Sequence, residues 1–191
     1  EYIVFFENDR LMSREVAATG LGGKPNFSTW LLPWPIFSVK NQWAMPGTIR
    51  DLRLDVFHST NYMIPLFAFP PSRRGTTRCV VTIHDVIPLL FPQFTPKAKK
   101  TRLFPIYKRL MIEIGRRANV ILTDSESSRR DVQQELRIPE TRSRQVLAVP
   151  IGISPMFKTA PKKRNGAKTI LYVGRLDPYK NVPGLIRVFA R

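Results

Sequence analysis

Two histidines occupy positions from which side chains often contact ligands, because each comes at the end of a short apolar run. His58 ends the run at residues 55–58, and the pair His84-Asp85 follows the run at residues 78–83. In doubly wound sheets, ligands bind beyond the carboxyl ends of the strands. A histidine donates or accepts hydrogen bonds near neutral pH, and a neighbouring carboxylate fixes its tautomer. His84 beside Asp85 is therefore the first candidate for contact with a hydroxyl or a developing charge.

The alternative for each histidine is a structural role in which the ring binds backbone groups. The sequence offers no third ligand type near either histidine, so it predicts no metal site.

A second candidate site is a cationic loop that follows an apolar run at residues 169–173. Gly174 is followed by Arg175 and, five residues later, by Lys180, where a helix is predicted to begin. Glycine lets the backbone approach a ligand, the guanidinium binds two phosphate oxygens, and an ammonium beside a helix N-terminus adds positive charge. The loop therefore fits a diphosphate. The alternative is a solvated turn in which Arg175 pairs with Asp177.

Composition narrows the possible partners and compartment. Lys and Arg number 31 against 14 acidic residues, for a net charge of +17, which favours a polyanionic partner or surface. Cys79 is the only cysteine, which excludes an internal disulfide and a cysteine-based zinc cluster and fits the cytoplasm. Prolines interrupt the most apolar segments, so the sequence predicts no membrane-spanning helix.

The elements that would position these residues alternate between strands and helices. Continuous apolar runs predict strands, and their lack of alternation favours a parallel sheet covered on both faces. The predicted strands are residues 2–6, 55–58, 78–83, 119–123 and 169–173. Helical spacing predicts one helix over residues 97–117 and another after Ser125, whereas residues 7–28 read as loop with at most a short helical turn. This order is typical of an α/β doubly wound sheet.

The candidate segments, in this order, resemble the retaining GT-B glycosyltransferases of family 4, especially its mannosyltransferase-like members. The matching segments are residues 55–58, 82–88, 119–131, 149–153 and 174–181. The resemblance implies two Rossmann-like doubly wound domains, of which this chain holds most of the first and only the start of the second. Residues 1–157 would form the N-terminal acceptor-side domain without its first strand, residues 158–168 a linker, and residues 169–191 the opening strand, loop and helix of the nucleotide-sugar-binding domain.

The resemblance also implies roles for individual residues. His84 would be the catalytic-site histidine that reaches the donor sugar, and Arg175 and Lys180, with Gly174, would grip the donor diphosphate. Four further residues would support the site or its acceptor side: Asp85, His58, Asn181 and Ser125.

The activity so implied is transfer of a sugar, with mannose from GDP-mannose as the best guess, to a saccharide or lipid-linked acceptor with retention of configuration, as in polysaccharide biosynthesis. The resemblance implies neither a cofactor nor a metal. The family's first strand, its glycine-rich loop and the paired glutamates of its second domain are absent from the sequence. We therefore expect little or no transferase activity from these 191 residues alone.

Three alternatives remain at this stage. A nucleic-acid-binding module would use the excess charge, but the sequence has no zinc finger, RNA-recognition or KH pattern, so no nucleic acid is expected. An anionic membrane, at the inner face of the cell membrane, would use the same charge, with the aromatic residues of segment 30–37 and Lys40 as anchors. An epimerase of the same fold is the third alternative, because fold does not fix the reaction.

Overall fold

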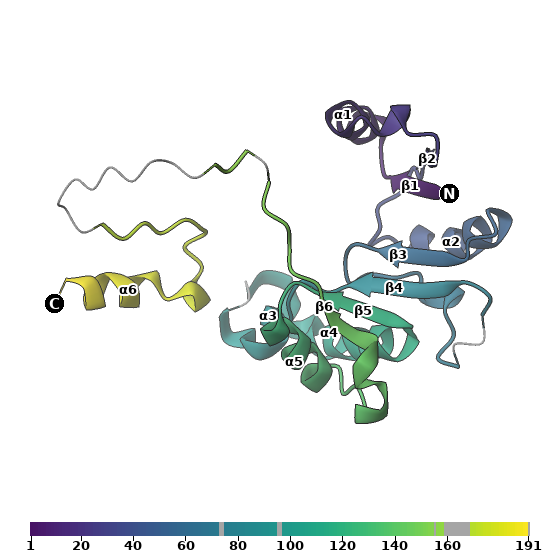
Figure 1. Ribbon diagram of the computed structural model, residues 1–191. Coiled ribbons are helices and arrows are strands. Elements are labelled where there is room, and N and C mark those ends of the chain that lie inside the picture. Colours follow the sequence, from purple (N-terminus) through teal and green to yellow (C-terminus); the bar gives the residue numbers. More distant parts are fainter. Residues whose placement is uncertain (73–74, 95–96, 155, 159–168, 191) are drawn as a thin grey trace.

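The computed structural model describes residues 1–72, 75–94, 97–154, 156–158 and 169–190, with only the backbone described at 97–102 and 143–144. Six strands and six α-helices follow one another along the described chain (Figure 1). The strands are β1 (Tyr2–Phe6), β2 (Phe27–Leu31), β3 (Val56–Ser59), β4 (Arg78–Thr82), β5 (Val120–Thr123) and β6 (Val146–Ala148). The helices are α1 (Asp9–Thr19), α2 (Val39–Asp51), α3 (Ile87–Leu90), α4 (Lys97–Arg117), α5 (Glu126–Glu135) and α6 (Val182–Phe189).

The main sheet is parallel, with the order β3-β4-β5-β6. Its strands were predicted as continuous apolar runs, except β6, which at three residues is too short to give a pattern. Cys79 and Val81 of β4 are fully buried, and Ile121 of β5 is nearly so. Met111 and Ile114 of α4 belong to the same core, which confirms an α/β sheet covered by helices.

Helix α4 confirms the predicted helix over residues 97–117, with Pro105 inside it. Of the apolar residues at helical spacing in this segment, Ile114 is fully buried, whereas Leu103 and Ile106 are exposed; Met111, outside that pattern, is also fully buried. Helix α5 follows Ser125 as predicted, and Val132 is its fully buried residue.

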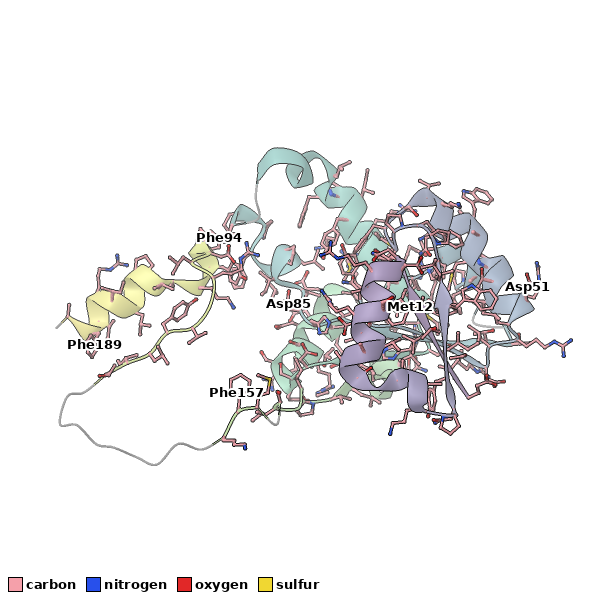
Figure 2. The ribbon with its side chains drawn as sticks, turned by 90° about the horizontal axis from the view of Figure 1, so that it is seen from above. Met12, Asp51, Asp85, Phe94, Phe157 and Phe189 are labelled. Atoms are coloured by element: carbon pink, nitrogen blue, oxygen red, sulfur yellow. The ribbon has the colours of Figure 1, made fainter. Side chains whose placement is uncertain are left out.

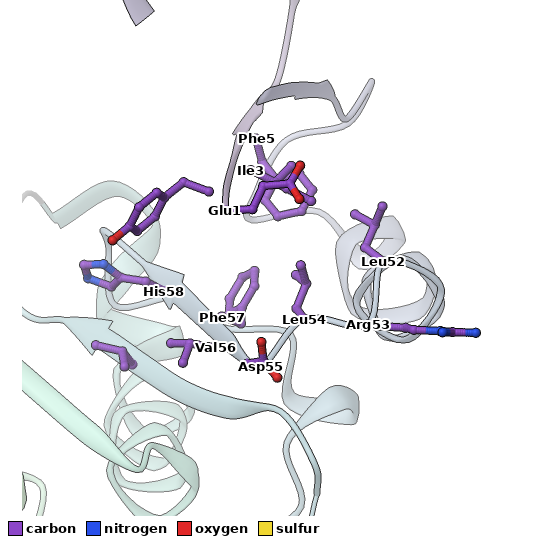
Figure 3. Close-up of a pocket in the computed structure, with 12 residues that line it drawn as sticks. Glu1, Ile3, Phe5, Leu52, Arg53, Leu54, Asp55, Val56, Phe57 and His58 are labelled. Carbon is purple, nitrogen blue, oxygen red and sulfur yellow. The ribbon is translucent and has the colours of Figure 1, made fainter. Parts of the chain in front are cut away.

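Strands β1 and β2 form a separate parallel pair beside β3. A cavity of about 640 Å³ lies between this pair and the main sheet. Figure 3 shows Ile3 and Phe5 of β1 on one side of the cavity and Leu54 and Phe57 on the other. Leu52 and Arg53, which follow helix α2, also line the cavity, and the Arg53 side chain extends away from it (Figure 3). The cavity therefore separates two sets of parallel strands.

The first 50 residues contain more regular structure than the sequence pattern predicts. The predicted loop at 7–28 contains α1, which is capped by Asn8, whose side chain accepts from the Leu11 N–H at 2.8 Å. Gly20 ends this helix in the left-handed region at φ 66°, where glycine has no steric penalty. The sequence pattern did not predict this helix, because none of its residues is buried and its apolar residues therefore lack a clear helical spacing. Helix α2 was not predicted either, because Pro46 and Gly47 lie inside it.

The C-terminal segment lies apart from the main sheet, on the side where β3 and β4 end (Figure 1). Residues 169–173 are not a hydrogen-bonded strand, contrary to the sequence prediction. Leu171 and Val173 are more than 80% exposed, and a strand requires a neighbour to satisfy its backbone groups. The predicted helix after Asn181 is present as α6, whereas most of the predicted linker, residues 159–168, lies outside the described residues.

No helix within the described ranges is both long and apolar enough to cross a bilayer.

Candidate functional site

The carboxyl ends of β3, β4 and β5 bring polar side chains together from distant parts of the sequence. Parallel pairing places Thr82 of β4 opposite Leu122 of β5. The Ile83 N–H donates to the Leu122 carbonyl at 2.8 Å, which extends this alignment beyond the end of β4. The residues that follow, His84 and Asp124, therefore leave the sheet side by side.

The predicted histidine His84 is held by a carboxylate. Its Nδ1 lies 2.9 and 3.1 Å from the two carboxylate oxygens of Asp124. The His84 side chain is 53% exposed and that of Asp124 only 26% exposed, so the carboxylate supports the ring from the protein side. A supported imidazole with an open face can hydrogen-bond a bound molecule.

Asp85 does not have the role that its place in the sequence suggests. Its Oδ1 accepts from the Ile87 N–H at 3.0 Å, at the start of the short helix α3. The carboxylate that orients His84 is Asp124, because parallel register brings β4 and β5 together while the chain after His84 turns into α3. Asp85 instead shapes the turn that follows the site histidine. Figure 2 shows Asp85 on the side of the molecule toward the C-terminal segment.

His58 lies on the neighbouring strand β3, and its ring contacts a side chain of the same sheet. Its Nε2 lies 2.9 Å from the Thr82 hydroxyl. Burial lowers the pKa of His58 below the ordinary histidine value, because a charged ring loses hydration there. His58 also lines the cavity between β1 and β3. It therefore serves the fold as a neutral ring that joins β3 to β4, through a side-chain hydroxyl and not through the backbone groups that the structural alternative expects.

Aromatic rings border the same edge of the sheet. The rings of Tyr62 and Tyr107 meet edge to face at 5.9 Å, and Phe37 lies 5.6 Å from Tyr62. Burial raises the pKa of Tyr107 to about 12, with smaller contributions from Tyr62 and from the negative charge of Asp85. Tyr107 is therefore a neutral phenol at physiological pH, and the aromatic group gives the site an apolar border.

The side chain of Ser125 caps the helix that follows it. Its Oγ accepts from the Ser128 N–H at 3.1 Å, which caps α5. The predicted N-cap is therefore confirmed, and this hydroxyl is used within the fold.

The cationic loop has a backbone conformation that requires glycine at residue 174. Gly174 has a φ of 156°, and a Cβ there would lie 3.0 Å from the Tyr172 hydroxyl oxygen. The Tyr172 hydroxyl donates to the Arg175 carbonyl at 2.7 Å, which closes the turn. Any side chain at residue 174 would disturb this closure, so glycine is needed for local geometry whether or not a ligand binds.

The two cations of this loop are accessible and have weak partners. Arg175 is 85% exposed and binds Asp177 at 3.2 Å, as the solvated-turn alternative predicts. The Lys180 ammonium lies 5.1 Å from the ring centre of Tyr179. Asn181 precedes α6 with a left-handed φ of 49°. Exposed ion pairs contribute little to stability, so Arg175 can exchange Asp177 for an anion at little cost.

The structure joins some of the predicted residues and leaves others apart. His84 and Asp85 share one edge of the sheet with His58, whereas the hydrogen bonds and ion pairs described for Gly174, Arg175, Lys180 and Asn181 stay within the C-terminal segment. The turn at Pro178–Lys180 lies on the same side of the main sheet as α3 (Figure 1), and in Figure 2 it lies toward Phe94. The cationic loop and His84 are thus on the same side of the molecule without direct contact in the described residues.

Two site residues were missed by the sequence reasoning. Asp124 follows β5 just as His84 follows β4, so the rule that ligands bind beyond the carboxyl ends of strands would have found it. Tyr107 gave no such signal, because its helical spacing indicates only a core residue. Among the described residues, no three His, Cys, Asp or Glu side chains gather as a metal-binding group.

Comparison with known proteins agrees with this geometry. The family model for glycosyltransferase family 4 matches residues 2–153, which include the whole main sheet and the site histidine. No curated protein matches the chain. The match covers most of the chain and supports sugar transfer, with a sugar donor and an acceptor as substrates. An α/β fold of parallel strands with His84 at their carboxyl ends, matched over these residues, shows that the chain belongs to glycosyltransferase family 4.

Proposed function

We propose that the enzyme containing this chain transfers mannose from GDP-mannose to a saccharide or lipid-linked acceptor with retention of configuration. The observation that carries this proposal is His84, which Asp124 supports at the carboxyl edge of the sheet with one face open. In the proposal, His84 contacts the donor sugar, and the aromatic border around Tyr62 and Tyr107 lies on the acceptor side.

Arg175 and Lys180 would act on the leaving group. The diphosphate gains negative charge as the bond to the sugar breaks, and fixed cations stabilise the transition state more than the ground state. Arg175 is 85% exposed, and its ion pair among the described residues is with Asp177, so the guanidinium can take a bidentate phosphate contact. The helix α6 begins directly after Asn181, and its N-terminal amides favour an anion nearby.

Calorimetric titration with GDP, UDP and GDP-mannose tests the diphosphate site. The full-length enzyme and its Arg175→Ala, Lys180→Ala double variant are compared, with Arg187→Ala of α6 as a control that removes a cation from the same segment. We expect the double variant to lose GDP binding by about 100-fold or more, at roughly 1.5–3 kcal/mol for each charged hydrogen bond. Equal GDP affinity in wild type and double variant would refute the site.

A transfer assay tests the reaction itself. Incubation of the full-length enzyme with GDP-mannose and acceptor should yield an α-linked product, which retains the donor's anomeric configuration and is identified by NMR of the anomeric proton. A changed sugar still attached to the nucleotide would instead identify an epimerase. The 191-residue chain, assayed in parallel, should show little or no turnover, and robust turnover would refute that part of the proposal.

We further propose that the enzyme touches an anionic membrane through an aromatic surface on α2 and the turn at Leu66–Ala68. Trp43 is 72% exposed and Phe67 60% exposed, and their rings lie 4.8 Å apart. In the segment 30–37, Trp34 is held within the fold, because its indole N–H donates to Asn41 at 3.2 Å and Lys40 lies over its ring, whereas Trp30 and Phe37 are 46% and 55% exposed. Exposed aromatic rings on a chain of net charge +17 suit the interface of an anionic bilayer.

Vesicle flotation tests this surface. We expect the chain to float with phosphatidylglycerol vesicles, and the Trp43→Ser, Phe67→Ser variant to float several-fold less. Phe157→Ser is the matched control, since Phe157 is 80% exposed but lies outside α2 and the turn at Leu66–Ala68. Binding that does not depend on anionic lipid would remove the membrane proposal.

A further inference from the structure

The contact between Asp124 and His84 follows from the backbone pairing of β4 and β5. The two residues lie 40 positions apart in the sequence, yet each stands two residues beyond the aligned pair Thr82 and Leu122. The hydrogen bond from the Ile83 N–H to the Leu122 carbonyl fixes the chain between these positions. The contact is therefore part of the sheet's register.

The contact restricts which nitrogen of the ring carries a hydrogen. An ionised carboxylate only accepts hydrogen bonds, so the Nδ1 that lies 2.9 and 3.1 Å from its oxygens must be the donor. In the neutral imidazole, Nε2 then carries a lone pair and no hydrogen.

We propose that Asp124 is a positioning residue, which holds His84 as the Nδ1–H tautomer so that Nε2 accepts a hydrogen bond from a hydroxyl group of the bound sugar. The sugar part of this inference rests on the proposed function. A hydroxyl donates to such a nitrogen, whereas a carbonyl or carboxylate offers only acceptors. His84 therefore selects substrates that carry a hydroxyl at this position, and an analogue without it leaves the nitrogen unpaired.

Asp85 provides a matched comparison within the same turn. It adjoins His84 in sequence, but its carboxylate accepts from the Ile87 N–H at 3.0 Å. An Asp85→Asn variant removes the same charge as a change at Asp124 while leaving the tautomer-fixing contact in place.

Nitrogen NMR of the ¹⁵N-histidine-labelled 191-residue chain, above neutral pH and without substrate, tests the tautomer directly. A His58→Gln variant assigns the two rings, since the sequence contains two histidines. We expect Nδ1–H for His84 in the wild type and in Asp85→Asn, a change to mainly Nε2–H in Asp124→Ala, and recovery in Asp124→Glu. An Nε2–H ring in the wild type, or an unchanged tautomer in Asp124→Ala, would overturn the inference.

The full-length enzyme with GDP-mannose tests the consequence for catalysis. We expect Asp124→Ala to lower kcat/KM about 10-fold, the effect of one hydrogen bond, and the surface change Asp51→Asn of α2 to leave it unchanged. If Asp124→Ala changes the tautomer but leaves kcat/KM at the wild-type value, the positioning role is overturned. If the wild-type enzyme fails to use GDP-mannose while the tautomer results hold, the donor assignment fails and Asp124 still sets the ring.

Discussion

At the scale of single residues, the hydrogen bonds of each polar group indicate whether the group serves the fold or is open to a ligand. Ser125 and Asp85 satisfy backbone N–H groups at helix starts, and His58 binds Thr82. His84 keeps one open face. A group that is already paired inside the fold has little left to offer a ligand, so His84 is the residue of this edge that we propose contacts the substrate.

His58 makes the stability of the fold depend on pH. Because burial lowers the pKa of His58 below its unfolded value of 6.5, the unfolded chain binds a proton more readily than the folded chain. The stability that His58 contributes is complete above that unfolded pKa and is lost as the pH falls toward the lower folded pKa. We expect the free energy of unfolding, measured by urea titration at a series of pH values, to fall less on acidification in His58→Gln than in the wild type. Identical pH profiles would contradict this.

Cys79 offers a second prediction at this scale. Its side chain is fully buried in β4, and burial raises the pKa of its thiol to about 12. The thiolate is the reactive form, so native Cys79 should react with a thiol reagent more than about 100-fold slower than in the urea-unfolded chain. As the only cysteine, it reports unfolding of the main sheet without added labels. Rapid labelling in native buffer would show that β4 is not buried.

How far a site can be predicted from sequence is also decided residue by residue. His84 is predictable, because it follows a strand that reads clearly as one apolar run. The assignment of Asp85 as its partner was wrong, because nearness in sequence carries no information about register across a sheet. The proposal that the cationic loop binds a ligand remains a prediction. Gly174 has the expected backbone conformation, but the ion pair between Arg175 and Asp177 is compatible with both a ligand site and a solvated turn.

At the scale of elements, predictability follows burial. Strands β3, β4 and β5 and helices α4 and α5 pack in one core, so their apolar patterns are strong. Helix α1 has no buried residue, so its apolar pattern is weak. Helix α2 contains Pro46 and Gly47, which have low helix propensity, and burial of Met45 and Ile49 stabilises it nevertheless. The predicted strand at 169–173 failed for the opposite reason, since its apolar residues have no neighbouring strand in the described chain.

Close packing between α4 and the end of α5 gives a prediction for this scale. A Cβ added at Gly115 would lie 3.2 Å from two carbon atoms of Leu136, which is itself 1% exposed and cannot easily move. Gly115→Ala should therefore destabilise the fold by about 1–2 kcal/mol through overpacking. Gly47→Ala in α2 is the control, because nothing lies within 4 Å of its Cβ, and it should stabilise by about 0.5–1 kcal/mol. Urea unfolding that ranks the two variants equally would contradict the proposed packing.

At the scale of the whole molecule, the main feature is a parallel sheet divided in two. The pair β1-β2 and the sheet β3-β4-β5-β6 lie on opposite sides of a cavity of about 640 Å³. In a doubly wound sheet of order 3-2-1-4-5-6, strand 1 lies between strands 2 and 4. The observed order fits this pattern if β2 corresponds to strand 3, β1 to strand 2 and β3 to strand 4. The cavity then occupies the position of strand 1.

We therefore expect one further parallel strand, which the family resemblance places before Glu1, to fill this cavity in a longer chain. Such a strand needs a crossover of about a dozen residues or more to reach β1, so a strand followed by a helix is required. Two strands alone are marginally stable, so β1 and β2 should exchange their amide hydrogens quickly in the 191-residue chain and slowly in the longer one. Hydrogen exchange followed by mass spectrometry measures this, with β4 and β5 as internal references and a Gly/Ser extension of equal length as the control. If β1 and β2 exchange equally fast in the chains with the natural and the Gly/Ser extension, the cavity is not a strand position, and the two sheets are independent units of the fold.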